Sequence, residues 1–327
     1  MELKTEITKL LGIKFPIIQG GLQGLGKEPL VSAVSEAGGL GLITAGSFPS
    51  KKEMQEDIER VRANTDKPFG VNIAIGIRKP MDEYVEGVIE SGVKIVFTSG
   101  YSPAKYMDQL KTAGIKVIHV VPSVKFAKKA EELGCDGVVI VGYECGGHPG
   151  VDEVTSMILI PEVVKAVKIP VIAAGGFKDG QGLLSALSLG AQGIQMGTRF
   201  VMSKESPLPN LIKEQLINAK LNDTVMVKRS INKPNRVYKN KAALQTLELE
   251  KSGASIDQLL PLIGGEAYKK LLETADIDAG ILSIGQVIGR IDDCPSVKEI
   301  IDSILNEADQ TLKIVNSYFK KEDVSII

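Results

Sequence analysis

The first two-thirds of the chain alternates between short apolar runs and longer segments in which apolar residues recur every three or four positions. Short apolar runs are typical of strands buried in a parallel sheet, and the longer pattern is typical of helices that cover such a sheet. The pattern predicts eight strands, at residues 16–19, 39–43, 69–73, 94–98, 116–120, 137–141, 170–174 and 193–196. It predicts helices between them, among which are residues 51–63, 80–91, 103–113, 123–133, 161–167 and 180–189. Eight such units favour an α/β fold closed into a (β/α)8 TIM barrel.

An open, doubly wound sheet is the main alternative to the barrel. The first glycine-rich segment, residues 20–26, does not place its glycines in the GxGxxG register of a dinucleotide-binding fold. The acidic residue that such a fold carries at its second strand is also missing. The sequence therefore favours the barrel.

The alternation ends after Phe200, and the remainder of the chain has mostly helical periodicity. We expect the barrel to occupy residues 1–202 and a smaller, mostly helical cap domain to occupy residues 203–290 beside the barrel mouth. We expect residues 291–327 to contain a C-terminal helix that returns to the barrel. A cap in this position would border the substrate site.

The charges of the chain exclude two classes of partner. The 39 Lys and Arg residues almost balance the 40 Asp and Glu residues, so the totals carry no electrostatic footprint for nucleic acid or for an anionic membrane surface. We therefore expect a small-molecule substrate. The oligomeric state stays open, with a homodimer among the options.

The cysteines and the amino terminus indicate the compartment. Cys135, Cys145 and Cys294 are odd in number and widely spaced, which fits a reducing compartment and argues against a disulfide framework or a CxxC metal site. The amino terminus lacks the apolar core of a signal peptide, and no apolar run reaches membrane-spanning length. We expect a cytoplasmic protein without a metal site.

Residues 141–150 are the most informative segment of the chain. They follow an apolar strand and set His148, one of only two histidines, among glycine and proline residues. Glycine lets the backbone approach a ligand closely, and an imidazole exchanges a proton near physiological pH. A hydrogen bond within its own loop is the simpler role for this histidine. In a glycine-rich loop at a barrel mouth, we favour proton transfer and predict that His148 is the catalytic residue.

The segments that follow the strands form the mouth of a barrel, where chemistry gathers. In this chain they are rich in glycine and small polar residues, namely Gly20, Gly21, Gln23, Asn72, Ser99, Gly100, Ser123, residues 142–148, Gly175, Gly176, Gln195, Gly197 and Thr198. The loops after strands seven and eight commonly offer backbone N–H groups to a phosphate. A tight strand-to-helix turn is the alternative role for Gly175 and Gly176. We expect a phosphorylated ligand or cofactor at these two loops.

Six segments together resemble the nitronate monooxygenase family, formerly called 2-nitropropane dioxygenases. They are residues 16–21 (PIIQGG), 37–41 (AGGLG), 67–72 (KPFGVN), 144–148 (ECGGH), 174–176 (AGG) and 196–200 (MGTRF). The family also includes flavin-dependent enoyl-ACP reductases and NAD(P)H:quinone reductases. The resemblance covers the whole barrel, and the ordered set of motifs is far more specific than any one of them.

The resemblance implies FMN at the barrel mouth, with four residues at its phosphate: Gly175, Gly176, Gly197 and Thr198. It implies that four further residues lie near the flavin ring or the ribityl chain: Gly21, Gln23, Asn72 and Gly147. The expected cofactor-binding set is completed by Gly20, Ser123 and Gln195. His148 matches the catalytic histidine of the family.

The implied reaction is the oxidation of alkyl nitronates with O2. The alternative is the reduction of a quinone or an enoyl-ACP, for which NADH or NADPH would reduce the flavin and an acyl-carrier protein would deliver the acyl substrate. A flavin-free phosphate-binding isomerase or lyase and a flavin-binding regulatory module without turnover are the remaining alternatives.

Three other features have simpler interpretations. His119 lies inside an apolar run, which indicates a core or strand-end histidine that is satisfied by a hydrogen bond. Cys145 is three positions from His148, but proximity in sequence does not establish a thiolate pair, and we interpret it as a bystander. The basic run at residues 228–236 is interpreted as a solvated helix face. Glu144 is interpreted as a solvated or locally paired carboxylate.

Overall fold

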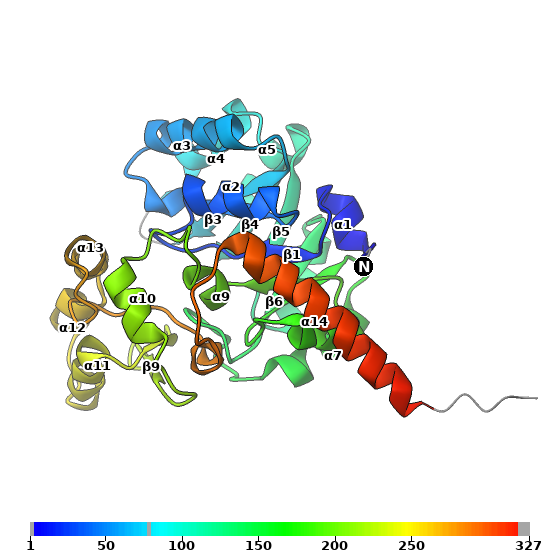
Figure 1. Cartoon of the computed structure of the whole chain (residues 1–327). Coiled ribbons are helices and arrows are strands. Elements are labelled where there is room, and N and C mark those ends of the chain that lie inside the picture. Colours follow the sequence, from blue (N-terminus) through cyan, green and yellow to red (C-terminus); the bar gives the residue numbers. More distant parts are fainter. Residues whose placement is uncertain (1–2, 77–79, 320–327) are drawn as a thin grey trace, which may run out of the picture.

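A computed structural model of the chain describes residues 3–76 and 80–319. Its centre is a barrel of parallel strands, namely β1 (Ile17–Gln19), β2 (Gly41–Thr44), β3 (Phe69–Ile75), β4 (Ile95–Gly100), β5 (Lys116–Val121), β6 (Gly137–Val141), β7 (Val171–Ala174) and β8 (Ile194–Met196). Strand β1 pairs with β8. The ring closes between β1 and β2, where the Gln19 N–H donates to the Leu40 carbonyl at 2.9 Å. The eight predicted strands and the (β/α)8 barrel are confirmed (Figure 1).

Helices follow the strands and cover the outside of the barrel. They are α2 (Glu28–Glu36), α3 (Lys51–Asn64), α4 (Asp82–Glu90), α5 (Ala104–Thr112), α6 (Val124–Glu132), α7 (Ser156–Ala166) and α8 (Gly180–Ser188), and α1 (Glu6–Leu11) precedes β1. The prediction was wrong for the start of α7, which begins five residues before Pro161. Proline is a common first residue of a helix, but here the Glu144 carboxylate accepts the Ser156 N–H at 3.0 Å and supports an earlier start.

Alternate residues of each strand point into different hydrophobic cores, because side chains in a strand alternate between two faces. The interior of the barrel is filled by one buried cluster, which includes Ile18, Leu42, Phe97, Ile118 and Val139. The residues between them belong to a second cluster that the barrel shares with its helices, including Ile17, Ile43, Val96, Val117 and Val138. Each fully buried aliphatic or aromatic side chain contributes roughly 1.5–3 kcal/mol. The barrel is therefore a packed core, and ligands are left to its ends.

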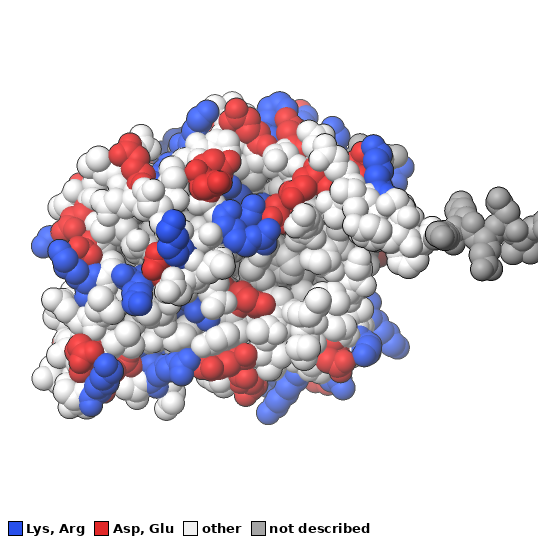
Figure 2. Space-filling view, turned by 60° about the horizontal axis from the view of Figure 1, so that its bottom comes forward, with Lys and Arg blue, Asp and Glu red and all other residues white. Residues whose placement is uncertain are grey.

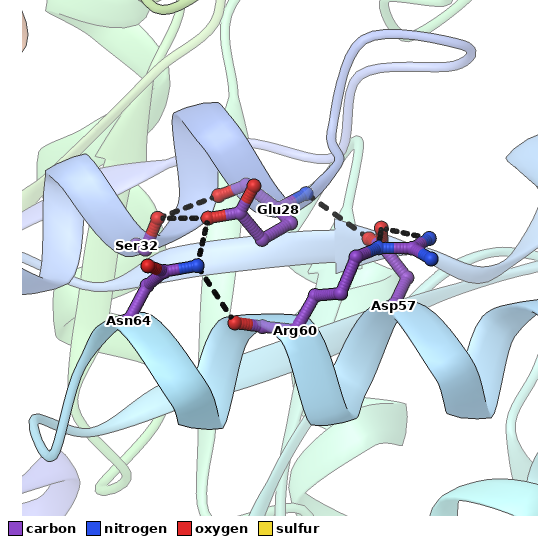
Figure 3. A network of polar contacts seen from close by, with 5 residues as sticks. All are labelled: Glu28, Ser32, Asp57, Arg60 and Asn64. Carbon is purple, nitrogen blue, oxygen red and sulfur yellow. Dashed lines mark hydrogen bonds and ion pairs between the residues drawn. The ribbon is translucent and has the colours of Figure 1, made fainter.

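A buried carboxylate joins α2 to α3 (Figure 3). Asp57 accepts the Glu28 N–H at 3.0 Å and the Arg60 guanidinium at 2.8 Å. The Asn64 amide donates to the Glu28 carboxylate at 3.0 Å. Lys27, the residue before α2, offers no side-chain cap, so Asp57 supplies from α3 the acceptor that a capping residue would supply. The start of α2 therefore has proline in its first turn as its local signal, while its capping acceptor comes from α3.

The chain beyond the barrel is mostly helical, as its sequence predicts. Its helices are α9 (Thr198–Val201), α10 (Asn210–Leu216), α11 (Lys241–Lys251), α12 (Ile256–Ile263), α13 (Gly265–Thr274) and α14 (Val297–Tyr318), with the 3-10 helix η2 (Gln286–Arg290) before α14. Another 3-10 helix, η1 (Ala45–Ser47), follows β2 in the barrel. It also contains an antiparallel hairpin of β9 (Thr224–Val227) and β10 (Asn235–Tyr238), which the helical pattern did not predict. Helices α10 to α13 gather on one side of the barrel, while α14, drawn in orange to red, runs past it (Figure 1).

Helix α14 packs directly on α8 of the barrel. A Cβ on Gly180 would lie 2.2 Å from the Ala308 nitrogen, so glycine is what lets the two backbones touch. The Glu307 carboxylate accepts the Gly180 N–H at 2.9 Å. Within the predicted C-terminal segment 291–327, residues 320–327 lie outside the described residues. The domain boundaries at residues 202 and 290 stay predictions.

The surface carries both signs of charge. Figure 2 shows one face on which acidic and basic side chains are interspersed with uncharged surface, in keeping with the near balance of charges in the sequence. Among residues 3–76 and 80–319, no helix is long and apolar enough to cross a membrane.

Candidate active site

Four of the predicted site residues form a continuous surface at the C-terminal ends of β1, β3 and β8, which we call the mouth floor. Glycine at position 21 lets the Asn72 side chain lie against the backbone, because a Cβ there would lie 2.4 Å from the Asn72 amide nitrogen. A Cβ on Gly20 would lie 3.2 Å from the side-chain nitrogen of Gln195. The structure therefore brings Gly20, Gly21, Asn72 and Gln195 together.

The mouth floor contains an unpaired polar atom. Gln195 Oε1 is buried and has no hydrogen-bond partner in the described residues. By contrast, Asn72 Oδ1 accepts from the Ser99 hydroxyl at 3.4 Å. Leaving a buried carbonyl oxygen unpaired costs about 1–3 kcal/mol, so such an atom calls for an explanation such as a bound ligand or ordered water. The unpaired Gln195 oxygen supports a ligand with an N–H or O–H donor at the mouth floor.

The loops after β6 and β7 interlock beside this floor. The Ser156 hydroxyl lies 3.0 Å from the Glu144 carboxylate and 2.8 Å from the Gly175 carbonyl. A Cβ on Gly142 would lie 2.0 Å from the Ser156 hydroxyl oxygen, and a Cβ on Gly175 would lie 2.9 Å from the Gly142 carbonyl. Glu144 is thus a locally paired carboxylate, as predicted, and the glycines permit the close contact of the two loops.

Gly175 and Gly176 also form a turn with unused donors. Their φ angles are 99° and 86°, a left-handed conformation that glycine adopts at little cost. Neither N–H group makes a hydrogen bond to the described part of the chain. Successive unpaired N–H groups in such a turn form an anion-binding concavity. The turn therefore fits a phosphate group.

The segment around Gly285 joins the loops after β6 and β8. The Thr198 hydroxyl oxygen accepts the Gly285 N–H at 2.9 Å, and a Cβ on Gly285 would lie 2.9 Å from the Gly146 nitrogen. The Thr198 hydroxyl keeps its own proton as a donor. A Cβ on Gly197 would meet only Leu22, at 3.5 Å, so this loop is open beside the β1 loop.

Two predicted residues stand apart from the mouth floor. Gln23 is exposed, and its side chain donates to the Gly46 carbonyl at 2.7 Å. Ser123 precedes α6 without a side-chain capping bond. Across the described ranges, no hydrogen bond joins either side chain to Asn72 or Gln195. Their assignment to a cofactor stays a prediction.

The loop that carries His148 is paired with the β9–β10 hairpin. Gly147 and Arg236 exchange two backbone hydrogen bonds, with N···O distances of 3.0 and 2.6 Å. Arg236 is buried, and its guanidinium donates to the Tyr143 carbonyl at 3.0 Å. Gly147 has a φ of 84°, which favours glycine at this position. The hairpin therefore holds the loop from which His148 projects.

His148 itself is exposed to solvent, and its Nε2 atom lies 3.1 Å from the Lys228 ammonium. Loss of hydration and the positive charges of Lys228 and Lys233 lower the pKa of the imidazole from 6.5 to about 4. Loss of hydration is the largest cause of the shift, and the charges of the two lysines add to it. The ring is therefore neutral at pH 7.

His119 is a core histidine satisfied by hydrogen bonds, as predicted, and the interpretation of Cys145 as a bystander stays a prediction. His119 is buried, and its Nδ1 atom lies 2.8 Å from the Thr98 hydroxyl and 3.1 Å from the Thr98 carbonyl. Burial raises the pKa of the Cys145 thiol to about 12, so it stays protonated and cannot act as a thiolate nucleophile. In the described segments, no three His, Cys, Asp or Glu side chains gather as a metal site.

The interpretation of residues 228–236 as a solvated helix face was wrong. The segment is the turn and second strand of the hairpin, where Lys228 contacts His148 and Arg236 is buried. The contact joins residues 80 positions apart, which no local pattern reveals. Pro234 was the available signal, because proline interrupts a helix.

Comparisons with known proteins extend these observations. The family model described as nitronate monooxygenase matches residues 4–307 of the chain. The (3aS,4S,5R,7aS)-5-hydroxy-7a-methyl-1-oxo-octahydro-1H-indene-4-carboxyl-CoA dehydrogenase of Mycobacterium tuberculosis is 34% identical, over 94% of this chain and 97% of that protein. A probable nitronate monooxygenase of Staphylococcus saprophyticus is 36% identical, over 73% of this chain and 80% of that protein.

A solved structure shares the whole architecture. FabK from Thermotoga maritima superposes with a TM-score of 0.91 at 39% sequence identity, and the match covers 97% of this chain and 100% of that chain. The likeness spans the barrel and the helical part alike, so the arrangement of the two parts is common to both proteins.

Proposed function

The chain belongs to the nitronate monooxygenase family and is an oxidoreductase, and from this premise we propose that it is an FMN-dependent enzyme that oxidises alkyl nitronates with O2. The observation that carries the proposal is the convergence of a neutral imidazole, His148, and an anion-binding glycine turn at one barrel mouth. A flavin mononucleotide needs such a turn for its phosphate, and the substrate needs a polar group beside the flavin.

The residues of the mouth fit FMN at three points. The unpaired N–H groups of Gly175 and Gly176 suit the phosphate. The unpaired Gln195 Oε1 suits an N–H or O–H donor of the flavin ring or the ribityl chain. Gly20 and Gly21 leave the floor free of side chains next to Gln195 and Asn72. When bound, FMN would supply the redox chemistry by accepting electrons from the substrate and passing them to O2.

His148 contacts the substrate by hydrogen bonding and, where its Nε2 atom is free, can exchange a proton with it. The ring is neutral at pH 7, so one nitrogen accepts a hydrogen bond and the other donates one. An imidazole at the mouth of a barrel is within reach of a substrate that enters from solvent. Acid–base assistance by such a group commonly contributes about 10²–10⁴-fold to a rate.

The second candidate function is the NAD(P)H-dependent reduction of an enoyl thioester or a quinone at the same flavin site. The coverage of the comparisons favours it, because the matches to the CoA dehydrogenase and to FabK extend over 94% and 97% of this chain. The match to the probable nitronate monooxygenase extends over 73%. In this reaction NADH or NADPH would be the reductant, and an acyl-carrier protein would be a partner if it carries the thioester.

Anaerobic flavin absorbance separates the two candidates. The purified protein is mixed in turn with propyl nitronate, NADH and NADPH. We expect nitronate alone to bleach the flavin. Rapid bleaching by a nicotinamide cofactor and none by nitronate would instead establish the reductase. A protein that never carries flavin would favour a phosphate-binding isomerase or lyase, and flavin that no donor reduces would favour a regulatory module.

The glycine turn can be tested separately by its flavin content. Gly175→Ala places a Cβ 2.9 Å from the Gly142 carbonyl and strains a left-handed residue. We expect the purified variant to carry much less FMN. Gly253→Ala is the matched control, since Gly253 has a φ of 76° but no atom within 4 Å of an added Cβ. An equal loss of FMN in both variants would contradict a phosphate role for Gly175.

We also propose a cytoplasmic location. The three cysteines support it, because all are free thiols and proteins of reducing compartments keep their thiols reduced. A homodimer stays a prediction that sedimentation would test.

A further inference from the structure

Lys228 brings an uncompensated positive charge to the candidate catalytic histidine. Its ammonium lies 3.1 Å from His148 Nε2 and forms no ion pair with any carboxylate of the described residues. Burial and, to a smaller extent, the charge of Lys233 lower the pKa of both His148 and Lys228, and Lys233 too has no ion pair there. In the same turn, Arg229 is bound to the Glu153 carboxylate at 2.6 Å. The two lysines thus differ from the neighbouring arginine in having no acidic partner.

Hydrogen bonds to Glu250 hold the turn and leave the Lys228 ammonium without a carboxylate partner among the described residues. Glu250 of α11 accepts the Lys228 N–H at 2.8 Å and the Ser230 N–H at 2.9 Å. The Ser230 hydroxyl also donates to Glu250, at 2.7 Å. The carboxylate that could neutralise Lys228 is therefore bound to the backbone of the turn. Lys228 has a φ of 65°, a left-handed conformation that a non-glycine residue adopts only when its surroundings hold it.

The charged and titratable groups around this pair come from the β6 loop, the hairpin and α11. They are Tyr143, Glu153, Arg229, Lys233, Arg236 and Glu250. Arg229 is occupied by Glu153 and the Tyr143 hydroxyl, and Arg236 is occupied by the Tyr143 carbonyl. Lys228 and Lys233 are therefore the cations of this group that have no acidic partner in the described residues.

We propose that Lys228 and His148 act as one anion-binding pair, in which the ammonium donates to Nε2 and uses its remaining N–H donors to bind anionic oxygen atoms of the substrate. The inference rests on the proposed function and adds Lys228 as the residue of that site that distinguishes the ionised substrate from its neutral parent acid.

The contact with Lys228 determines which nitrogen of the His148 ring carries the proton. An ammonium has three donors and no acceptor, so its contact with Nε2 requires that nitrogen to accept. A neutral imidazole that accepts at Nε2 carries its proton on Nδ1. Two donors of Lys228 then remain, and a nitronate offers two oxygen atoms that share its negative charge. Hydrogen bonds between ionised partners are stronger than those between neutral groups.

A neutral nitroalkane gains much less from this arrangement. It offers no net charge to Lys228, and it must lose its α-proton to a base. His148 Nε2, the nitrogen that could take this proton, is already engaged by the ammonium. Removal of Lys228 therefore weakens the binding of a nitronate and frees Nε2 to act as a base.

Imidazole NMR tests the pair without any turnover. The chain has two histidines, so a histidine-labelled sample gives two ring signals, which His148→Gln assigns. In the wild type we expect His148 to carry its proton on Nδ1 and to titrate far below its usual range. In Lys228→Met we expect the His148 midpoint to rise by about one pH unit or more, because a neighbouring positive charge is removed. His119, bonded to Thr98, is the internal reference and stays unchanged.

Steady-state kinetics test the substrate preference. For Lys228→Met we expect the KM for propyl nitronate to rise about tenfold, with a smaller change in kcat, and the preference for nitronate over 1-nitropropane to shrink by at least as much. Lys228→Arg keeps the charge and should restore much of the nitronate binding. Lys251→Met is the matched control, because Lys251 lies on α11 beside Glu250 but pairs with Glu248.

Each outcome decides one part of the inference. A proton on Nε2 of His148 in the wild type overturns the pair, and this measurement needs no variant to fold. An unchanged His148 midpoint in a folded Lys228→Met protein overturns it as well. If Lys228→Met shifts the His148 titration midpoint but leaves the KM for nitronate unchanged, only the role of Lys228 in substrate preference is overturned. A wild type that oxidises no nitronate overturns the proposed function, while tautomer and midpoint still decide the Lys228–His148 contact.

Discussion

The two histidines share a lowered pKa, and burial is the largest cause in both, but only His148 also has positive charges nearby. His119 is buried on the outer face of β5, and Thr98 occupies its Nδ1 atom. His148 projects from a loop at the barrel mouth, where burial acts together with the charges of Lys228 and Lys233. In both cases the pKa of the ring is about 4. A shifted pKa therefore does not by itself mark a catalytic group.

The two imidazole rings differ in the groups that surround them. Around His119, the hydroxyl and the carbonyl of Thr98 are paired with the ring, and the site is closed by the barrel and its helices. The barrel mouth instead collects unpaired groups, among them Gln195 Oε1 and the N–H groups of Gly175 and Gly176, and the Lys228 ammonium there has no ion pair within the described residues. Unpaired polar groups cost free energy, so a cluster of them points to a ligand.

The largest expected effect is the loss of activity in His148→Gln. The variant keeps a polar side chain but loses the ring that holds Lys228 and positions the substrate. We expect kcat/KM to fall about 100-fold or more for the substrate that the absorbance experiment identifies. The free energy of unfolding should change by less than about 0.5 kcal/mol, because the residue is exposed. A fall of less than about threefold would contradict a catalytic role.

His119→Ala should show the reverse pattern. The variant leaves a cavity between β5 and its helices and removes the partner of the Thr98 hydroxyl. We expect the free energy of unfolding, measured in urea, to fall by about 2–4 kcal/mol, while kcat/KM of the folded protein stays close to that of the wild type. A loss of activity without a loss of stability would place His119 in the reaction and remove the contrast.

The pH dependence of stability should come mainly from His119. Because the pKa of each ring is about 4 in the folded state and 6.5 in the reference state, the unfolded chain binds protons first as the pH falls. The contribution is complete above pH 6.5 and is lost as the pH falls towards 4. It amounts to at most about 3 kcal/mol for the buried His119 and to less for the exposed His148. Urea unfolding at several pH values should show a shallower dependence in His119→Ala than in His148→Gln.

The smallest expected effect is that of Lys233→Met. Lys233 lowers the pKa of His148 through its charge and makes no direct contact with the ring among the hydrogen bonds of the described residues. We expect the NMR titration midpoint of His148 to rise by about half a pH unit, less than in Lys228→Met, because an indirect charge is more strongly screened. The midpoint of His119 should not move. A rise as large as that of Lys228→Met would mean that the direct contact adds nothing.

Much of the barrel was predictable because its signals are local. Apolar runs at residues 69–73 and 116–120 coincide with β3 and β5, and Gly180 was correctly placed at the start of α8. The exceptions are helix starts that depend on distant groups. Asp57 caps α2 from α3, and Glu144 supports the start of α7 from the β6 loop. Neither contact leaves a pattern in the helix that it stabilises.

Part of the candidate site was predictable for the same reason. Gly20 and Gly21 follow β1, Asn72 and Gln195 lie in β3 and β8, and parallel strands of one barrel bring their carboxyl ends to one edge. The hairpin was not predictable, because its two short strands interrupt a helical region and pair with a loop from another part of the chain.

The sequence by itself determined the barrel, the family and the identity of His148 as the candidate catalytic residue, because periodicity and ordered motifs are written along the chain. Only the tertiary structure decided the neighbours of that residue. It brought Lys228 to His148, bound Glu250 to the turn backbone and left Gln195 Oε1 without a partner. The physical reason is that charge and hydrogen bonding act over a few ångströms in space, whereas Lys228 and His148 lie 80 positions apart in sequence.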